Sequence, residues 1–237
     1  AEEKPATAKA ESTMSEAERL ALRDEVRAYL LEHPEVLVEA MNVLQQREDD
    51  AALARDAKFI TDNKDLIFTN DNDWVGGNPN GDITLVEFMD YRCGYCRKAY
   101  ADVDKLIKSD GNIRFVVKEF PILGDASMLS AQFAIALRQL HGDEPYAKAH
   151  DTLMSLRGEP TVETLARLAT DMGFEPQPIL DRMKSPEVAA VIQTNYDLAQ
   201  KMDITGTPAF IMGDIVMRGY APFETMKDFV ADARTGG

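Results

Sequence analysis

The pair of cysteines constrains this chain most, because they are the only two in 237 residues and lie three positions apart. They occur as Cys93-Gly94-Tyr95-Cys96, after the apolar run of residues 83–89 and at the start of a helical pattern that ends at Asp110-Gly111. The apolar run is typical of a buried central strand, and residues 113–120 have the pattern of a second strand. A strand, a helix and a strand in this order predict a βαβ unit with a parallel pair, and therefore an α/β fold.

Three kinds of chemistry use a C-x-x-C motif. A zinc site needs two further ligands, and the chain offers only His33, His141 and His150, which are remote in sequence. We expect His141 and His150 at the surface of a helical region. A structural disulfide that closes so small a loop stabilises a fold by only about 2 kcal/mol in the entropy model. Thiol-disulfide exchange is the interpretation that the motif favours.

Each cysteine has a predicted role in that exchange. Free backbone N–H groups at a helix N-terminus stabilise a thiolate, so we expect Cys93 to be the attacking sulfur. Cys96 lies one turn later and faces inward, and we expect it to resolve the mixed disulfide. Glu87, six residues before Cys93 in an apolar strand, is a candidate buried carboxylate that exchanges a proton with Cys96. A position at a strand edge, facing solvent, is the alternative for Glu87.

The rest of the chain after residue 60 predicts one domain interrupted by helices. Residues 70–82 are rich in Asn, Asp and Gly and predict a loop. Helical patterns occupy about residues 125–200. Two short apolar runs then flank Gly213-Asp214 and predict a β-hairpin, which a closing helix over about residues 222–233 follows.

The N-terminal part predicts a separate helical extension over residues 15–60, after a disordered tail of residues 1–14. Ser15 and Glu18 form the signature of a capping box, and His33-Pro34 separates two amphipathic helices. Two helices cannot bury their apolar faces by themselves. We expect the extension to mediate self-association; the alternative is that it folds back on the main domain.

Composition excludes several classes of partner. The chain carries 41 Asp and Glu against 26 Lys and Arg, a net charge of -15, which argues against nucleic acid because a phosphate backbone requires a basic surface. No apolar run reaches a membrane span, so we expect no membrane insertion. The small and acidic start of the chain is typical of a sequence left after signal cleavage, and a trimmed chain would look the same.

Several of these segments together resemble the DsbA-like branch of the thioredoxin superfamily over about residues 65–237. They are the strand that ends in Glu-Phe-x-Asp-Tyr-x-Cys-x-x-Cys, the helical insert, and Thr-Pro before a hairpin and a terminal helix. Within that branch, four features are most similar to the ScsC group, the suppressor-of-copper-sensitivity proteins C. These are Cys-Gly-Tyr-Cys, Asp90-Tyr91-Arg92, the segment Lys118-Glu119-Phe120-Pro121-Ile122-Leu123-Gly124 and the helical extension.

The resemblance implies a thioredoxin fold in residues 61–237 with an inserted helical domain, and an exported, periplasmic protein. It implies that Thr207-Pro208 is a cis peptide bond that offers backbone groups to an extended substrate. Gly94 and Tyr95 would tune Cys93, and the redox-active pair would need no cofactor and no metal.

The resemblance also implies a function. Cys-Gly-Tyr-Cys with Thr before the cis-proline matches the pattern of periplasmic disulfide isomerases, and some ScsC-like proteins trimerise through an N-terminal helical stalk. We therefore expect a homo-oligomeric isomerase, with a trimer favoured, that acts on misfolded or reduced exported proteins and is reset by a membrane redox partner. The alternatives are a monomeric dithiol oxidase or reductase and, in another class, a non-catalytic holdase or Cu(I)-binding protein.

Overall fold

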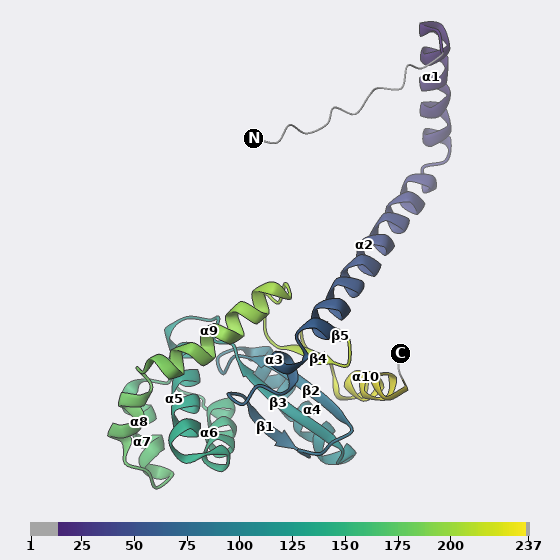
Figure 1. Cartoon of the computed structure of the whole chain (residues 1–237). Helices are drawn as coiled ribbons and strands as arrows, with labels where there is room; N and C mark the ends of the chain where they lie inside the picture. Colours follow the sequence, from purple (N-terminus) through teal and green to yellow (C-terminus); the bar gives the residue numbers. More distant parts are fainter. Residues whose placement is uncertain (1–13, 236–237) are drawn as a thin grey trace. The chain divides into compact units, whose positions relative to one another are not determined.

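The computed structural model describes residues 14–235, and the chain divides between Ala52 and Leu53 into two compact units (Figure 1). The predicted tail, residues 1–14, lies outside the described residues apart from Met14. No helix among residues 14–235 combines the length and the apolar character that a membrane crossing requires.

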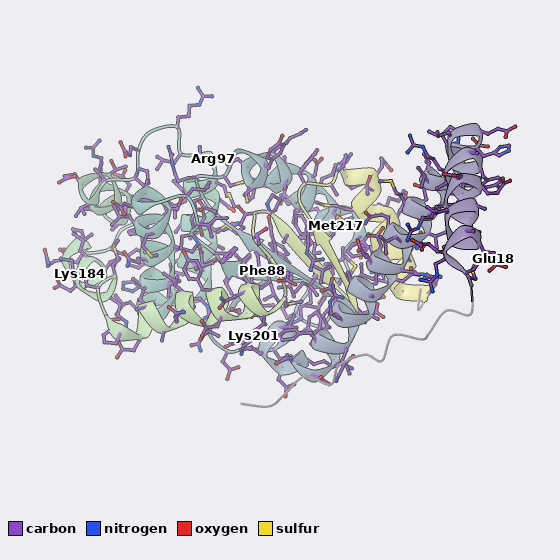
Figure 2. The ribbon with its side chains drawn as sticks, turned by 90° about the horizontal axis from the view of Figure 1, so that it is seen from above. Glu18, Phe88, Arg97, Lys184, Lys201 and Met217 are labelled. Carbon is purple, nitrogen blue, oxygen red and sulfur yellow. The ribbon has the colours of Figure 1, made fainter. Side chains whose placement is uncertain are left out.

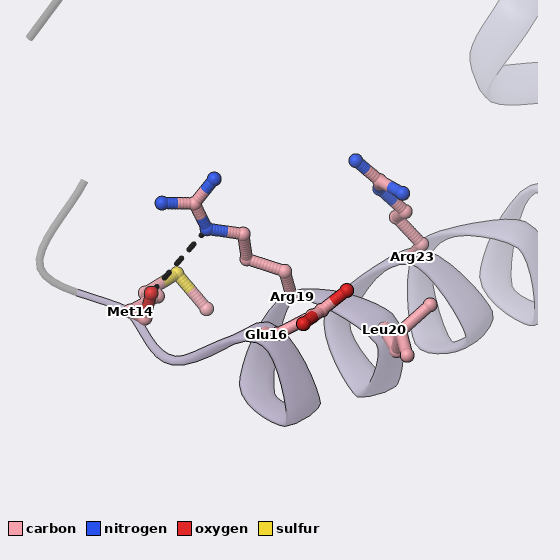
Figure 3. A pocket seen from close by; sticks show the side chains of 5 residues that line it. All are labelled: Met14, Glu16, Arg19, Leu20 and Arg23. Atoms are coloured by element: carbon pink, nitrogen blue, oxygen red, sulfur yellow. Dashed lines mark hydrogen bonds between the residues drawn. The ribbon is translucent and has the colours of Figure 1, made fainter. Parts of the chain in front are cut away.

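The first unit consists of α1 (Glu16–Glu32) and most of α2 (Glu35–Asp62). The predicted capping box is confirmed: the Glu18 N–H donates to Ser15 Oγ at 3.3 Å, and the Ser15 N–H donates to the Glu18 carboxylate at 2.7 Å. Arg19 Nε also reaches back, at 3.3 Å, to the Met14 carbonyl at the start of the helix (Figure 3). The helices separate at Pro34, as predicted, because proline ends the hydrogen-bonding pattern of the helix before it.

The second unit contains a five-stranded sheet in the order β1-β3-β2-β4-β5. The central strand β2 (Ile83–Met89) pairs in parallel with β3 (Ile113–Glu119), and α4 (Gly94–Asp110) connects them, so the predicted βαβ unit is confirmed. The predicted hairpin is β4 (Ala209–Met212) and β5 (Ile215–Arg218), and the closing helix is α10 (Phe223–Thr235).

The loop prediction for residues 70–82 is wrong in part, because β1 (Trp74–Gly77) lies inside it and pairs antiparallel with β3. Two of its four residues are glycines, so the sequence shows no strand-like alternation. A Cβ at Gly76 would lie 2.3 Å from the Trp74 ring, which explains why a glycine is needed there. Gly77 has a φ of 66°, a conformation that glycine adopts without strain.

The predicted helical insert between β3 and β4 is confirmed and contains five helices (Figure 1). They are α5 (Asp125–His141), α6 (Asp143–Ser155), α7 (Val162–Asp171), α8 (Pro176–Arg182) and α9 (Pro186–Lys201). Gly142, with a φ of 91°, separates the first two helices, and prolines occupy the first positions of the last two.

The sheet is buried on both faces. Side chains alternate along β2, so that Leu85 and Met89 pack beneath α4, α10 and the insert, whereas Phe88 packs on the opposite face. Figure 2 shows Phe88 within the body of the unit. The opposite face is covered by α3 (Lys64–Phe68), by the end of α9 and by Ile60 of α2, which is 1% exposed.

The last part of α2 therefore packs as part of the second unit. Besides Ile60, the Asp56 carboxylate accepts two hydrogen bonds from the Arg218 guanidinium on β5, at 2.9 and 3.1 Å. A second ion pair is fully buried on the same face, where the Lys118 ammonium binds the Asp73 carboxylate and donates to the Leu66 carbonyl at 2.7 Å. These contacts fix β1, β3 and β5 to the helices that cover them.

Candidate active site

The two cysteines lie at the beginning of α4, close to the end of the central strand. Cys93 is the N-cap residue and Cys96 lies one turn into the helix. Both are free cysteines in this structure. Cys93 is 8% exposed and Cys96 is fully buried, so Cys93 offers the sulfur that another chain can reach.

The residues Thr207 and Pro208 meet the cysteines although they are more than a hundred positions away. The Cys93 Sγ–H donates to the Thr207 carbonyl at 3.2 Å. The Thr207-Pro208 peptide bond is cis, as the resemblance implied. Pro208 is buried and Thr207 is partly exposed, so the backbone of this loop borders the accessible sulfur.

Glu87 lies on β2 beneath the cysteines and is 2% exposed. The alternative of a solvent-facing edge position is wrong, because β2 is the central strand and is covered on both faces. Burial raises the pKa of the Glu87 carboxyl to about 8. Burial also raises the pKa of Cys96, and the nearby Glu87 charge raises it further. The pKa values of both groups therefore lie above their ordinary values.

Asp90 organises the segment before the cysteines, a role that our sequence analysis did not assign. One carboxylate oxygen accepts from the Arg92 N–H at 2.7 Å, and the other accepts from the N–H groups of Ile122 and Leu123 at 2.8 and 3.0 Å. The Asp90 N–H points at Cys96 Sγ, at 3.5 Å. The two motifs that carried the resemblance, one before the cysteines and one after β3, are thus joined through one side chain.

A second buried carboxyl lies next to this segment. Glu119 accepts hydrogen bonds from the Tyr91 and Tyr146 hydroxyls at 2.7 and 2.6 Å, and Tyr91 also contacts His150 Nδ1 at 3.1 Å. Burial raises the pKa of Glu119 to about 8 and lowers the pKa of His150 to about 4. The surface position predicted for His150 is wrong, because its ring is buried against Trp74 and three tyrosines.

The two residues between the cysteines differ in their surroundings. A Cβ at Gly94 would meet open space, and Tyr95 is 64% exposed. The Tyr95 ring stacks on Tyr220, with centroids 6.4 Å apart, and Lys98 Nζ lies 4.2 Å from the centre of the Tyr220 ring. This small aromatic and basic surface beside Cys93 was not predicted, because Tyr220 follows β5 and no motif connects it to the cysteines.

A dithiol at a helix N-terminus, with one sulfur accessible, one buried above a carboxyl, and a cis-proline loop beside them, defines a thiol-disulfide oxidoreductase. Residues 69–232 match the family described as thioredoxin, and the chain belongs to that family. Residues 18–51 match a second family, described as the copper resistance protein ScsC N-terminal domain. Both matches agree with the resemblance to DsbA-like and ScsC proteins.

Three relatives illustrate the similarity. A thioredoxin-like oxidoreductase from Silicibacter pomeroyi DSS-3 is 39% identical, with a TM-score of 0.69, over 73% of this chain and 98% of its own. BcfH of Salmonella enterica Typhimurium is 26% identical, with a TM-score of 0.76, over 92% of this chain and 96% of its own. Disulfide bond formation protein D of Bacillus subtilis (strain 168) is 24% identical over 170 residues, which are 66% of this chain and 74% of that protein.

Proposed function

We propose that this oxidoreductase is a disulfide isomerase that acts on misfolded exported proteins as a homo-oligomer. The observation that carries the proposal is the first unit, whose α1 has no buried residue. Large apolar side chains of both helices are about half exposed or more; they are Leu20, Leu22, Val26, Tyr29, Leu31, Leu37, Val38, Met41, Val43 and Leu44. Apolar surface of this extent is typical of an interaction site.

The shape of the first unit supports self-association. An apolar groove of about 520 Å³ lies between α1 and α2, lined mainly by leucines and Val26. Burying one leucine or valine side chain contributes roughly 1.5–3 kcal/mol, so several of them offset the entropy of association. The match of residues 18–51 to the ScsC N-terminal domain also supports the proposal. A trimer would place three dithiol sites on one client.

The chemistry of the proposal uses two sulfurs and one carboxyl. The Cys93 thiolate attacks a client disulfide, forms a Cys93–client disulfide and releases one client thiolate. In isomerisation, another client thiolate attacks the client sulfur of that bond and expels Cys93 as thiolate. When no client thiolate attacks, Cys96 attacks Cys93 Sγ, and Glu87 takes the Cys96 proton. A Cys93–Cys96 disulfide forms and the client leaves reduced.

The surroundings of the cysteines would guide the client. Thr207 and Pro208 offer backbone groups to an extended client chain, and Gly94 and Tyr95 tune the reactivity of Cys93. A membrane redox partner would restore the dithiol in an exported compartment. The relatives named above support thiol-disulfide exchange as the activity, and the choice of isomerisation rests on the extension.

The test compares the full chain with surface variants of the extension in the reactivation of scrambled ribonuclease. Met41 is 70% exposed and Leu37 is 51% exposed, so Leu37→Glu with Met41→Glu should leave the second unit folded. We expect this double variant to be monomeric by light scattering and to lose most reactivation. Gln45→Glu with Gln46→Glu, on the same helix, is the matched control and should keep both properties. A monomeric wild-type chain, or full reactivation by the monomeric variant, would contradict the proposal.

A further inference from the structure

A half-open cavity of about 280 Å³ lies on the face of the sheet that carries Cys96, enclosed by β1, β2, β3, α4 and α6. Its walls include the Trp74 and Phe115 rings from the sheet, Tyr100 from α4 and His150 from α6. Glu87 lines it as well, and neither cysteine does. The cavity is therefore separate from the surface at which Cys93 meets a client.

The aromatic walls are held in place by their own contacts. Trp74 Nε1–H donates to the Asp143 carbonyl at 3.2 Å, and its ring stacks on His150 at 5.9 Å between centroids. The Tyr100 hydroxyl donates to the Asp151 carboxylate at 2.6 Å. Such walls need little reordering when a ligand enters, which favours binding.

The Glu87 carboxyl is uncompensated. Its Oε1 is buried and has no hydrogen-bond partner among the described residues. Leaving a buried polar atom unpaired destabilises the free protein, so a ligand that pairs with this oxygen removes that penalty on binding. The lysine of the lining, Lys108, already binds Asp104 at 2.8 Å and is exposed. The residues that line the cavity therefore leave the Glu87 carboxyl without a positively charged partner.

The charged and titratable groups around Glu87 favour the binding of a cation. Those on α4 are Cys96, Tyr100, Asp104 and Lys108, and those on α6 are His150 and Asp151. Burial keeps the pKa of His150 near 4, so that ring is neutral at pH 7. The chain as a whole has a net charge of -15, which attracts cations.

We propose that this cavity binds a small aromatic ammonium compound, with its ring among the aromatic walls and its ammonium group on Glu87 Oε1. A cavity of about 150 Å³ holds benzene, so the space suffices for one ring with a short amino side chain. Aromatic faces also attract an ammonium group through cation–π interactions.

Binding would affect the redox centre. A bound ammonium stabilises the charged form of Glu87 and lowers the affinity of this carboxylate for a proton, so Glu87 becomes a weaker acceptor for the Cys96 proton. This consequence rests on the proton transfer in the proposed function. The binding itself does not, and its test measures no redox activity.

Trp74 is the single tryptophan of the chain, so intrinsic fluorescence reports directly on the cavity. We expect benzylamine to change this fluorescence saturably and to bind at least about tenfold more tightly than benzyl alcohol, its neutral analogue. The affinity for benzylamine should rise by up to about tenfold per pH unit as the pH approaches 8, because Glu87 must lose its proton. Equal binding of the two compounds, or no saturable change, would refute the proposal.

Two variants assign the effect to Glu87. Glu87→Gln should weaken benzylamine at least about tenfold and leave benzyl alcohol unchanged, because only the charge is lost. Glu119→Gln removes another fully buried carboxyl, on the neighbouring strand but outside the cavity lining, and should keep benzylamine binding. Unweakened binding by Glu87→Gln would overturn the assignment. If this variant does not fold, the pH dependence and the comparison with benzyl alcohol decide.

Discussion

Replacing Glu87 by glutamine should change how the stability of the protein depends on pH. The Glu87 carboxyl has an ordinary pKa of 4.5 in an unfolded chain, and burial raises it to about 8 in the folded protein. Between these values the folded state keeps a proton that the unfolded state has lost. The contribution of Glu87 to the free energy of unfolding is therefore fully present below pH 4.5 and is lost as the pH rises through about 8.

The magnitude follows from the size of the rise. Each pH unit between the two values removes about 1.4 kcal/mol of unfolding free energy, so the full loss is roughly 5 kcal/mol. Glu87→Gln has no proton to lose at this position. Between pH 5 and pH 8, the variant should lose roughly 4 kcal/mol less stability than the wild-type protein. Glu119, whose pKa burial also raises to about 8, affects both proteins alike and does not enter the difference.

The assay is equilibrium unfolding in urea at several pH values, followed by circular dichroism. The cysteines are kept as a disulfide, so that the thiols do not titrate. Glu224→Gln, which changes an exposed glutamate at the start of α10, is the matched control and should follow the wild-type pH dependence. If the stability of Glu87→Gln falls with pH as steeply as that of the wild type, then Glu87 is not a desolvated, uncompensated carboxyl, and the reasoning fails.

Three further predictions concern other parts of the second unit. Cys96→Ala should accumulate mixed disulfides with a client that carries disulfides, visible on non-reducing gels, because Cys93 still attacks the client disulfide and the buried resolving thiol is gone; a variant that releases clients at the wild-type rate would contradict this role. Asp73→Asn should destabilise the protein by about 3–5 kcal/mol in urea unfolding, because it leaves the Lys118 ammonium buried without its partner; a loss below about 1 kcal/mol would show that the pair is not buried as described. Asp56→Asn should cost only about 1 kcal/mol, because its partner Arg218 is partly exposed; a much larger loss would mean that this contact does more than fasten α2 to β5.

The main elements could be predicted from the sequence because their signals are local. The apolar run of residues 83–89, the Ser15 cap and the Gly213-Asp214 turn each predict an element that the structure contains. The strand β1 could not be found in this way, because two of its four residues are glycines and its pairing with β3 is a contact across the fold.

The same distinction applies to the site. The spacing of Cys93 and Cys96 is a local signal. Glu87 could also be predicted, because it is a carboxyl within an apolar strand. Tyr220 and His150 lie near the cysteine segment only because of how β5 and α6 pack in the fold. The residues next to them in the sequence do not indicate these contacts. The surroundings of the buried His150 ring come from Tyr146 on its own helix and from rings of three other segments, which single-sequence patterns cannot bring together.

The edges of the sheet have a consequence for the proposed function, in which misfolded chains are the clients. The two edge strands, β1 and β5, have four residues each; β1 ends in two glycines, and β5 ends in an arginine bound to Asp56. Short edges of this kind give an extended polypeptide little backbone to pair with, which protects a sheet from templated aggregation. In the proposed function, a client would thus be held through a bond that thiol exchange can break, and the risk of a permanent β-sheet contact with it would stay low.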